Sequence, residues 1–313
     1  MDGATAGIMD KAGYSRVVSR RLSTVCDAIS VLRDSMTDHE RLDVARRLIA
    51  SYDALMPDVS VWKLLLGVLP ASVSERLATF RSSELGHRVV NDVIMDSYPG
   101  ERIVKYWFAR NHVDELDSTV IFELNVGASR LDIARVNGCS YAYEVKTELD
   151  NLARLESQMS DYEKVFEYVY AVVHPRHTAN ALEMLPPHCG IVQIRDCCHE
   201  AKFDVIRDAV ESSFLSPEAQ VESLSSKDLG QLLCMIGMSP APNTRAERQK
   251  AVLDALDDRQ INTLFKELIK AKFSSRWRFV QQHFNQLLPV DMELFYRSMA
   301  DPKWVYYRCS SMV

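Results

Sequence analysis

The sequence of 313 residues predicts a mixed α/β core between two helical regions. Short runs rich in β-branched and aromatic residues recur between residues 119 and 195, which indicates strands. An Asn-Gly pair separates two of these runs and is a strong signal for a β-hairpin. On both sides, apolar residues recur every three or four positions, which is typical of amphipathic helices. We therefore expect a helical N-terminal region at residues 1–80, an α/β core at 81–213 and a helical C-terminal module at 214–313.

The N-terminal region is expected to hold three helices. Thr37 and Glu40 have the spacing of a capping box, which predicts a helix that begins there and runs to Leu55. The next helix is expected over Val61–Leu69 and ends before Pro70. No catalytic pattern occurs in this region, so we expect it to pack or to dimerise. The earliest helix is predicted from apolar residues at helical spacing, namely Val17, Leu22, Val25 and Ile29.

The core is expected to begin with two helices, Ser83–Asp96 and Glu101–Asn111, separated by Pro99 and Gly100. A meander of three strands follows, and then helices and strands alternate. The helix after the third strand is a crossover, so the fourth strand should lie parallel to a neighbour. The expected strands are Thr119–Leu124, Ser129–Val136, Cys139–Lys146, Tyr168–Val173 and Gly190–Arg195, and the expected helices between them are Leu149–Val165 and Ala179–Leu185.

The C-terminal module is expected to contain the helices Ser226–Ile236, Arg245–Leu256, Asp258–Lys270 and Trp277–Leu287. Basic residues outnumber acidic ones between residues 245 and 278, and a helical module with this excess is suited to phosphate contacts. A solvated helix face with paired charges explains the same pattern, and on charge alone we favour that reading. The basic residues are Arg245, Arg248, Lys250, Arg259, Lys266, Lys270, Lys272, Arg276 and Arg278.

Composition is that of a globular protein, with 47% hydrophobic and 26% charged residues. No run of about 18 apolar residues occurs, so we expect no membrane partner. The first residues lack the pattern of a signal peptide, and the seven cysteines are scattered, so we expect a cytoplasmic chain with reduced thiols. The net charge of −6 argues weakly against a nucleic-acid partner, but acidic metal sites also contribute to it.

Two carboxylates and a lysine on the hairpin predict a site for a divalent metal ion and a phosphodiester. Glu144 and Lys146 are two residues apart on one strand and therefore share a face. Asp132, on the preceding strand, has to reach the same face for both carboxylates to bind one ion. Such hard oxygen ligands suit Mg²⁺ or Mn²⁺. The ion would activate a water and neutralise charge on the phosphate, and Lys146 would orient the water or stabilise the developing charge.

The length of the hairpin connection decides whether this site exists. A two-residue turn at Asn137–Gly138 would pair Val136 with Cys139, and would place Asp132 and Glu144 on opposite faces. A three- or five-residue connection with a glycine bulge restores the shared face. A metal site therefore requires that the hairpin is not a simple two-residue one.

The segment from Glu101 to Arg195 resembles the PD-(D/E)xK nuclease superfamily, and within it a bacterial branch of poorly characterised nucleases. The resemblance rests on the pattern RLDIARVNG, then YEVKTELDNLARL, then Gln-x-x-x-Tyr, and it covers about a third of the chain. It implies a restriction-endonuclease-like mixed sheet sandwiched by helices. Leu131 replaces the proline that often precedes the aspartate of this superfamily. By this resemblance the catalytic residues are Asp132, Glu144 and Lys146, supported by Gln158 and Tyr162 on the following helix.

Many members of that superfamily add an acidic metal ligand from the first helix. Glu101 and Glu84 are the two candidates for this role, and Glu101 is favoured because its helix comes directly before the first strand. Glu123, in the first strand, is a further candidate ligand because an adjacent strand could place it beside Asp132.

The sequence thus predicts an Mg²⁺- or Mn²⁺-dependent nuclease that acts on nucleic acid, DNA rather than RNA, with a homodimer as a possible assembly. The alternative is a catalytically inactive protein of the same fold that binds nucleic acid or serves as an assembly module, for example in a phage-defence or mobile-element system.

Other patterns are expected to have no functional role. The pairs His188-Cys189 and Cys197-Cys198-His199 match no standard zinc spacing. His174 and His177 are expected in a loop after a strand. The tyrosine pairs Tyr141/Tyr143 and Tyr168/Tyr170 indicate strand packing rather than base stacking.

Overall fold

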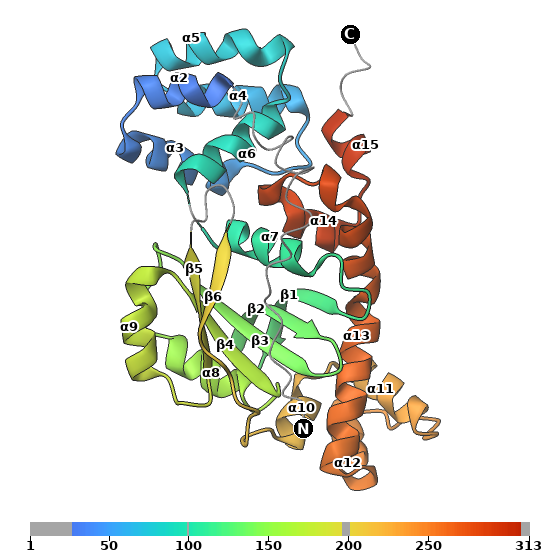
Figure 1. Cartoon of the computed structure of the whole chain (residues 1–313). Coiled ribbons are helices and arrows are strands. Elements are labelled where there is room, and N and C mark those ends of the chain that lie inside the picture. The colour runs from blue at the N-terminus through green and yellow to red at the C-terminus, as the bar shows by residue number, and fades with distance from the viewer. Residues whose placement is uncertain (1–26, 99, 196–200, 308–313) are drawn as a thin grey trace. The chain divides into compact units, whose positions relative to one another are not determined.

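The computed structural model describes residues 27–98, 100–195 and 201–307 (Figure 1). These residues form two compact units. Unit 1 comprises the described residues up to 111, residue 201 and residues 279–307, and unit 2 comprises residues 112–195 and 202–278. The units cut across the three segments expected from the sequence, whose boundaries stay a prediction. The early part of the helix expected from Val17 lies outside the described residues.

Unit 1 is helical. Thr37 caps its helix through a capping box with Glu40, as expected, but this helix ends at Ser51 because Tyr52 is extended. The helix expected from Ser83 begins only at Gly86. Among the helices of this unit, α6 packs against α2, α3 and α4. The helices are α2 (Asp27–Ser35), α3 (Asp38–Ser51), α4 (Asp58–Val68), α5 (Ala71–Ala78), α6 (Gly86–Ser97), α7 (Glu101–His112, to residue 111), α14 (Met292–Ser298) and α15 (Pro302–Tyr307), with short 3-10 turns η1 (Thr79–Ser82), η2 (Phe284–Gln286) and η3 (Pro289–Asp291).

A buried polar cluster holds unit 1 together. The Tyr52 hydroxyl donates to Asp291 Oδ2 (3.1 Å) and lies 2.7 Å from His87 Nδ1. The Tyr306 hydroxyl donates to the same Asp291 oxygen (2.8 Å). Burial raises the pKa of Asp291 to about 7, although both tyrosine hydrogen bonds act in the opposite direction. Burial also lowers the pKa of His87.

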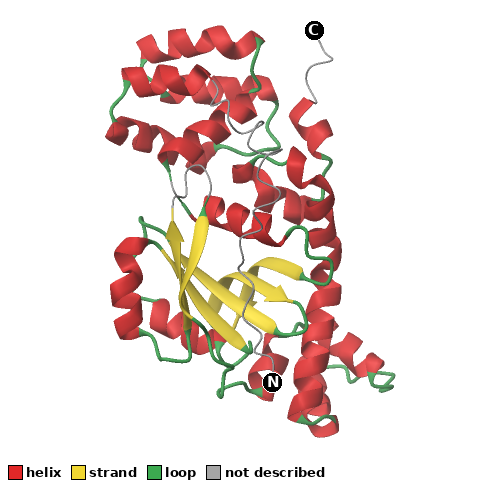
Figure 2. Cartoon of the chain, viewed as in Figure 1, coloured by secondary structure: helices red, strands yellow, loops and turns green. Residues whose placement is uncertain are grey.

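Unit 2 contains a six-stranded mixed sheet with strand order β1-β2-β3-β4-β5-β6 (Figure 2). The first three strands form an antiparallel meander, β3, β4 and β5 are parallel, and β6 is antiparallel to β5. The mixed α/β class expected from the sequence is confirmed, as is the parallel placement of the fourth strand. The strands are β1 (Thr119–Val126), β2 (Ser129–Val136), β3 (Ser140–Lys146), β4 (Tyr168–Val173), β5 (Gly190–Arg195) and β6 (Lys202–Arg207).

Two crossover helices connect the parallel strands. Helix α8 (Leu155–Tyr162) packs on β2, β3 and β4, and α9 (Pro175–Met184) packs on β4 and β5. The sequence predicted that α8 would begin at Leu149, which is wrong. The preceding residues form a loop in which Asp150 Oδ2 accepts hydrogen bonds from the backbone and the hydroxyl of Thr147 (2.7 Å each). A side chain that bonds the backbone locally in this way competes with helix formation.

The β2–β3 connection has the length that the metal site requires. Val136 pairs with Ser140, so three residues form the connection, and its Gly138 has a φ of +102°. This left-handed conformation favours glycine. The expectation that the hairpin is not a two-residue one is confirmed, and the register, continued beyond Ile133↔Tyr143, places Asp132 opposite Glu144 on one face of the sheet.

The tyrosines of β3 and β4 lie on the opposite face of the sheet from Glu144. Tyr141 stacks on Tyr168 and Tyr143 on Tyr170, with ring centroids 5.1 and 5.3 Å apart. The Arg135 guanidinium lies 4.7 Å from the centre of the Tyr141 ring. These contacts confirm strand packing as their role.

The C-terminal part of unit 2 is helical, and its basic residues mostly bond within the unit. Lys266 Nζ contacts Glu167 (2.7 Å) and the Gly138 carbonyl (2.8 Å), and Lys270 Nζ donates to the Asp117 carbonyl (2.7 Å). One long helix replaces the two that were expected after Asp258. None of the helices in the described residues is both long and apolar enough to span a membrane. The helices are α10 (Pro217–Ser223), α11 (Ser226–Met235), α12 (Arg245–Ala255) and α13 (Asp258–His283, to residue 278).

Candidate functional site

A buried carboxylate, Glu144, is the centre of the candidate site. Its side chain is on the face of β3 that α8 covers, and the residue is only 2% exposed. Lys146 Nζ donates to Glu144 Oε1 (2.6 Å), and Gln158 Nε2 donates to the same oxygen. The Tyr162 hydroxyl donates to Oε2 (2.8 Å). Four of the five catalytic residues expected from the sequence are therefore in direct contact.

Local structure explains why these four side chains meet. Glu144 and Lys146 are two residues apart on a strand, so both point to the same face. Gln158 and Tyr162 are four residues apart on α8, so they lie on one face of that helix. Burial, followed by the charge of Glu144, strongly raises the pKa of Tyr162. A raised pKa keeps the Tyr162 hydroxyl neutral, which suits its hydrogen bond to Glu144.

Asp132 completes the site at a point where the sheet is irregular. The β2–β3 pairing stops at Ile133↔Tyr143, and beyond it the Val145 amide donates to Asp132 Oδ2 (2.7 Å) instead of to a strand carbonyl. Asp132 is 9% exposed, and its charge helps to raise the pKa of Tyr162. The carboxylate of Asp132 is thus held on the backbone of the strand that carries Glu144.

Glu123 lies opposite Asp132 on β1, at a second irregularity. The β1–β2 pairing runs Phe122↔Ile133 and then Leu124↔Leu131, and it skips Glu123, whose φ is +60°. This conformation costs a residue with a Cβ about 1 kcal/mol or more. Carboxylate oxygens of Glu123 and Asp132 lie within 4.8 Å of each other. The expectation that an adjacent strand places Glu123 beside Asp132 is confirmed.

The other two expected ligands belong to unit 1. Glu101 is the first residue of α7 and pairs with the buried Lys105. Glu84 lies in the turn before α6 rather than on a helix. Their roles in metal binding remain predictions.

The donor set of unit 2 fits a hard divalent cation. Glu123 and Asp132 offer carboxylate oxygens, which Mg²⁺ and Mn²⁺ prefer. Gln158 is 8% exposed, and its Oε1 atom has no hydrogen-bond partner among the described residues. A buried carbonyl oxygen without a partner is costly, and an ion or its water would satisfy it. Both oxygens of Glu144 accept from protein donors, Asp132 Oδ2 accepts from the Val145 amide, and Glu123 pairs with Arg130.

A cavity of about 570 Å³ lies between α9 and the loop before α8, and the sequence did not indicate it. His177, expected in a loop, lies in α9 and contacts the Thr147 carbonyl (3.1 Å). His174 caps the same helix by accepting from the Arg176 amide. The cavity is lined by Asn151, Leu152, Arg176, His177, Asn180, Glu183 and Met184.

Cys189, directly before β5, is not an activated nucleophile. Cys189 is fully buried, and burial raises the pKa of its thiol to about 11. It is therefore protonated near neutral pH, whereas a reactive cysteine needs a lowered pKa. Cys197, Cys198 and His199 lie outside the described residues.

Fold and site together define a mixed α/β protein whose sheet carries a buried cluster of carboxylates, lysine, amide and phenol on one face. The chain belongs to the family described as Bacteriophage P4 protein cII, which matches residues 101–295, more than half of its length. The matched part contains all six strands and every residue of the cluster.

A curated relative, Protein cII of Enterobacteria phage P4, is 24% identical over 186 residues, which cover 59% of this chain and 69% of the relative. No solved structure matches the chain.

Proposed function

We propose that this protein hydrolyses phosphodiester bonds of nucleic acid, DNA rather than RNA, as an Mg²⁺- or Mn²⁺-dependent nuclease with a restriction-endonuclease-like core. The observation that supports the proposal most is the meeting of Asp132, Glu144 and Lys146 on one face of the sheet, through a hairpin register that a two-residue turn would forbid. The residues come from a pattern that resembles the PD-(D/E)xK nucleases.

The side chains divide the work in this proposal. Asp132 and Glu123 would bind the ion, which when bound polarises a phosphate oxygen and lowers the pKa of a water. Lys146, held by Glu144, presents a positive charge beside the carboxylates and would stabilise negative charge that develops on the phosphate. Gln158 and Tyr162 also donate to the Glu144 carboxylate, which would keep it, and with it Lys146, in one orientation.

A second candidate function rests on one specific observation. Glu144 is 2% exposed, and both of its oxygens accept hydrogen bonds from protein donors. A carboxylate in this state supports structure without binding an ion. The protein would then be an inactive member of the same fold that binds nucleic acid or serves in an assembly.

A nuclease assay separates the two candidates. Full-length protein is incubated with supercoiled plasmid, linear DNA and RNA, each with Mg²⁺, Mn²⁺ or EDTA. We expect cleavage of DNA with either metal, and loss of at least about a hundredfold in rate in Asp132→Asn and Lys146→Met. Lys164→Met, which changes an exposed lysine two residues after Tyr162, is the control and should cleave like the wild type. Binding of DNA without cleavage under every condition would favour the second candidate.

A further inference from the structure

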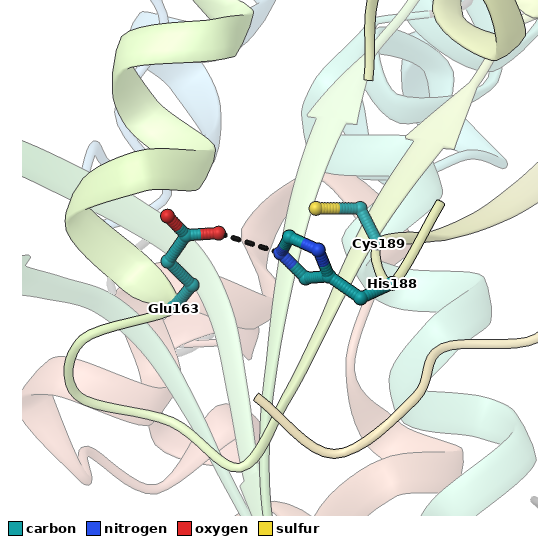
Figure 3. A group of neighbouring side chains, drawn as sticks. All are labelled: Glu163, His188 and Cys189. Carbon is teal, nitrogen blue, oxygen red and sulfur yellow. Dashed lines mark hydrogen bonds and ion pairs between the residues drawn. The ribbon is translucent and has the colours of Figure 1, made fainter. Parts of the chain in front are cut away.

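Three metal-ligating side chains of different chemistry meet at the end of α8, away from the carboxylates of the candidate site. Glu163 directly follows α8, and His188 and Cys189 directly precede β5 (Figure 3). One ligand atom from each lies within 4.8 Å of the other two. His188 Nε2 is 2.7 Å from Glu163 Oε2, and in Figure 3 the imidazole and the thiol both point towards the side of Glu163.

The backbone around these side chains is held from several directions. The segment after β6 supplies most of the contacts. The Ser212 hydroxyl donates to the Glu163 carbonyl (2.7 Å), and the Val210 amide donates to the His188 carbonyl (2.9 Å). Arg207 Nε donates to the Cys189 carbonyl (2.8 Å). The three side chains therefore sit on a preorganised frame, which lowers the entropy cost of binding a ligand.

The donor set selects a class of metal. A thiolate, an imidazole and a carboxylate together suit Zn²⁺ and chemically similar transition metals, whereas Mg²⁺ prefers oxygen alone. A doubly charged cation would balance the carboxylate and the thiolate, so the complex would be neutral. Neutrality of the complex is important because an uncompensated charge is costly in a buried place. Cys189 is fully buried, and the side chains of Glu163 and His188 are only 12% and 23% exposed.

The distance between His188 and Glu163 requires only a small adjustment. In a tetrahedral zinc site, a nitrogen and an oxygen ligand about 2.0–2.1 Å from the ion lie roughly 3.3 Å apart. The observed distance between His188 Nε2 and Glu163 Oε2 is 2.7 Å, a hydrogen bond that the ion would replace. The partly exposed His188 leaves an approach for a water as the fourth ligand.

We propose that Glu163, His188 and Cys189 form a binding site for Zn²⁺ or a similar transition metal, distinct from the Mg²⁺ or Mn²⁺ site. The bound ion joins the end of α8 to the loop before β5. Glu163 directly follows Tyr162, so the ion also holds the end of the helix that carries two residues of the candidate site. The spacing His188-Cys189 gave no hint of this, because the third ligand is 25 residues away in sequence.

Titration of metal-free, full-length protein with Co²⁺, a spectroscopic substitute for Zn²⁺, tests the proposal. We expect one equivalent to bind with the absorption band of a cobalt–thiolate bond. The band should disappear in Cys189→Ala, and the affinity should fall at least about tenfold in His188→Gln. It should persist in Cys139→Ala and in the double variant Cys197→Ala/Cys198→Ala, which removes the neighbouring Cys-Cys pair.

Two results would overturn the assignment: no thiolate band in the wild type, or a band that survives Cys189→Ala or is lost in the Cys197→Ala/Cys198→Ala variant. Circular dichroism shows whether Cys189→Ala folds. If it does not, Glu163→Gln decides the matter, since it retains a hydrogen-bonding group beside His188 but should weaken Co²⁺ binding at least about tenfold. Unchanged affinity in that variant would contradict the proposal equally.

Discussion

Replacing Lys146 with methionine should destabilise unit 2 much more than replacing both members of its ion pair. Glu144 is 2% exposed and Lys146 is its cationic partner at 2.6 Å. Removing one member of a buried pair costs about 3–5 kcal/mol, because the remaining charge is left without compensation. Gln158 and Tyr162 still donate to Glu144, so we expect the lower end, about 3 kcal/mol, for Lys146→Met. The double variant Glu144→Gln/Lys146→Met removes both charges and should cost less than Lys146→Met alone.

Urea unfolding at pH 7.5 measures these differences, with circular dichroism and tryptophan fluorescence recorded together because the chain has two compact units. Lys164→Met is the matched control and should change the free energy of unfolding by less than about 0.5 kcal/mol, since Lys164 is exposed. A cost below about 1 kcal/mol for Lys146→Met, or a double variant less stable than Lys146→Met, would show that the ion pair does not stabilise unit 2 in this way.

Four further outcomes are expected. The free energy of unfolding, measured in urea, should be about 1 kcal/mol higher for Glu123→Gly than for Glu123→Ala, because glycine adopts the φ of +60° without strain. Both variants should lose metal-dependent cleavage. Burial raises the pKa of Asp291 to about 7, whereas the pKa of an aspartate in an unfolded chain is about 4. The folded chain therefore holds the extra proton, and Asp291 should lower the free energy of unfolding by up to about 4 kcal/mol as pH rises from about 4 to about 7. In urea titrations, Asp291→Asn should remove this contribution and leave that of Asp92, whose pKa burial raises to about 6. Lys266→Ala should cost about 1–3 kcal/mol, because it removes a half-buried ion pair and a bond to the hairpin, and hydrogen exchange should show faster opening at Gly138. Of Glu84→Gln and Glu101→Gln, we expect only the second to reduce Mg²⁺-dependent cleavage, and a loss in the first alone would reverse that order.

Strand positions could be predicted from the sequence because β-branched and aromatic runs carry a local signal. Ser129–Val136, Tyr168–Val173 and Gly190–Arg195 have the predicted bounds. β6 was missed because KFDVIR is half-exposed and shows no continuous apolar run. The start of α8 was predicted wrongly because hydrogen bonds between Asp150 and Thr147 compete with the helix. The spacing of apolar residues gives no information about such contacts.

The site was predicted through chemistry rather than through periodicity. The requirement that Asp132 and Glu144 share a face excluded a two-residue connection and left three or five residues, and the register has three. The burial of Glu144 could not be predicted in the same way. It depends on α8, whose Gln158 and Tyr162 come from another part of the chain and cover the Glu144 side chain. The cluster of Glu163 with His188 could not be predicted for the same reason, because only tertiary packing brings α8 next to the loop before β5.

The irregularities of the β1–β2 and β2–β3 pairings meet at Asp132, and this determines how the role of Asp132 should be tested. Buried amides need acceptors, and here the Asp132 carboxylate accepts from Val145 where the strand ladder has stopped. Asp132→Ala should leave that amide unsatisfied and cost about 1–3 kcal/mol whatever the function of the site. Asp132→Asn keeps an acceptor oxygen but removes the charge, so it should retain most of the stability and lose metal-dependent cleavage. If Asp132→Asn instead cleaves DNA as the wild type does, while Asp132→Ala only unfolds more easily, then this carboxylate completes the sheet and takes no part in hydrolysis.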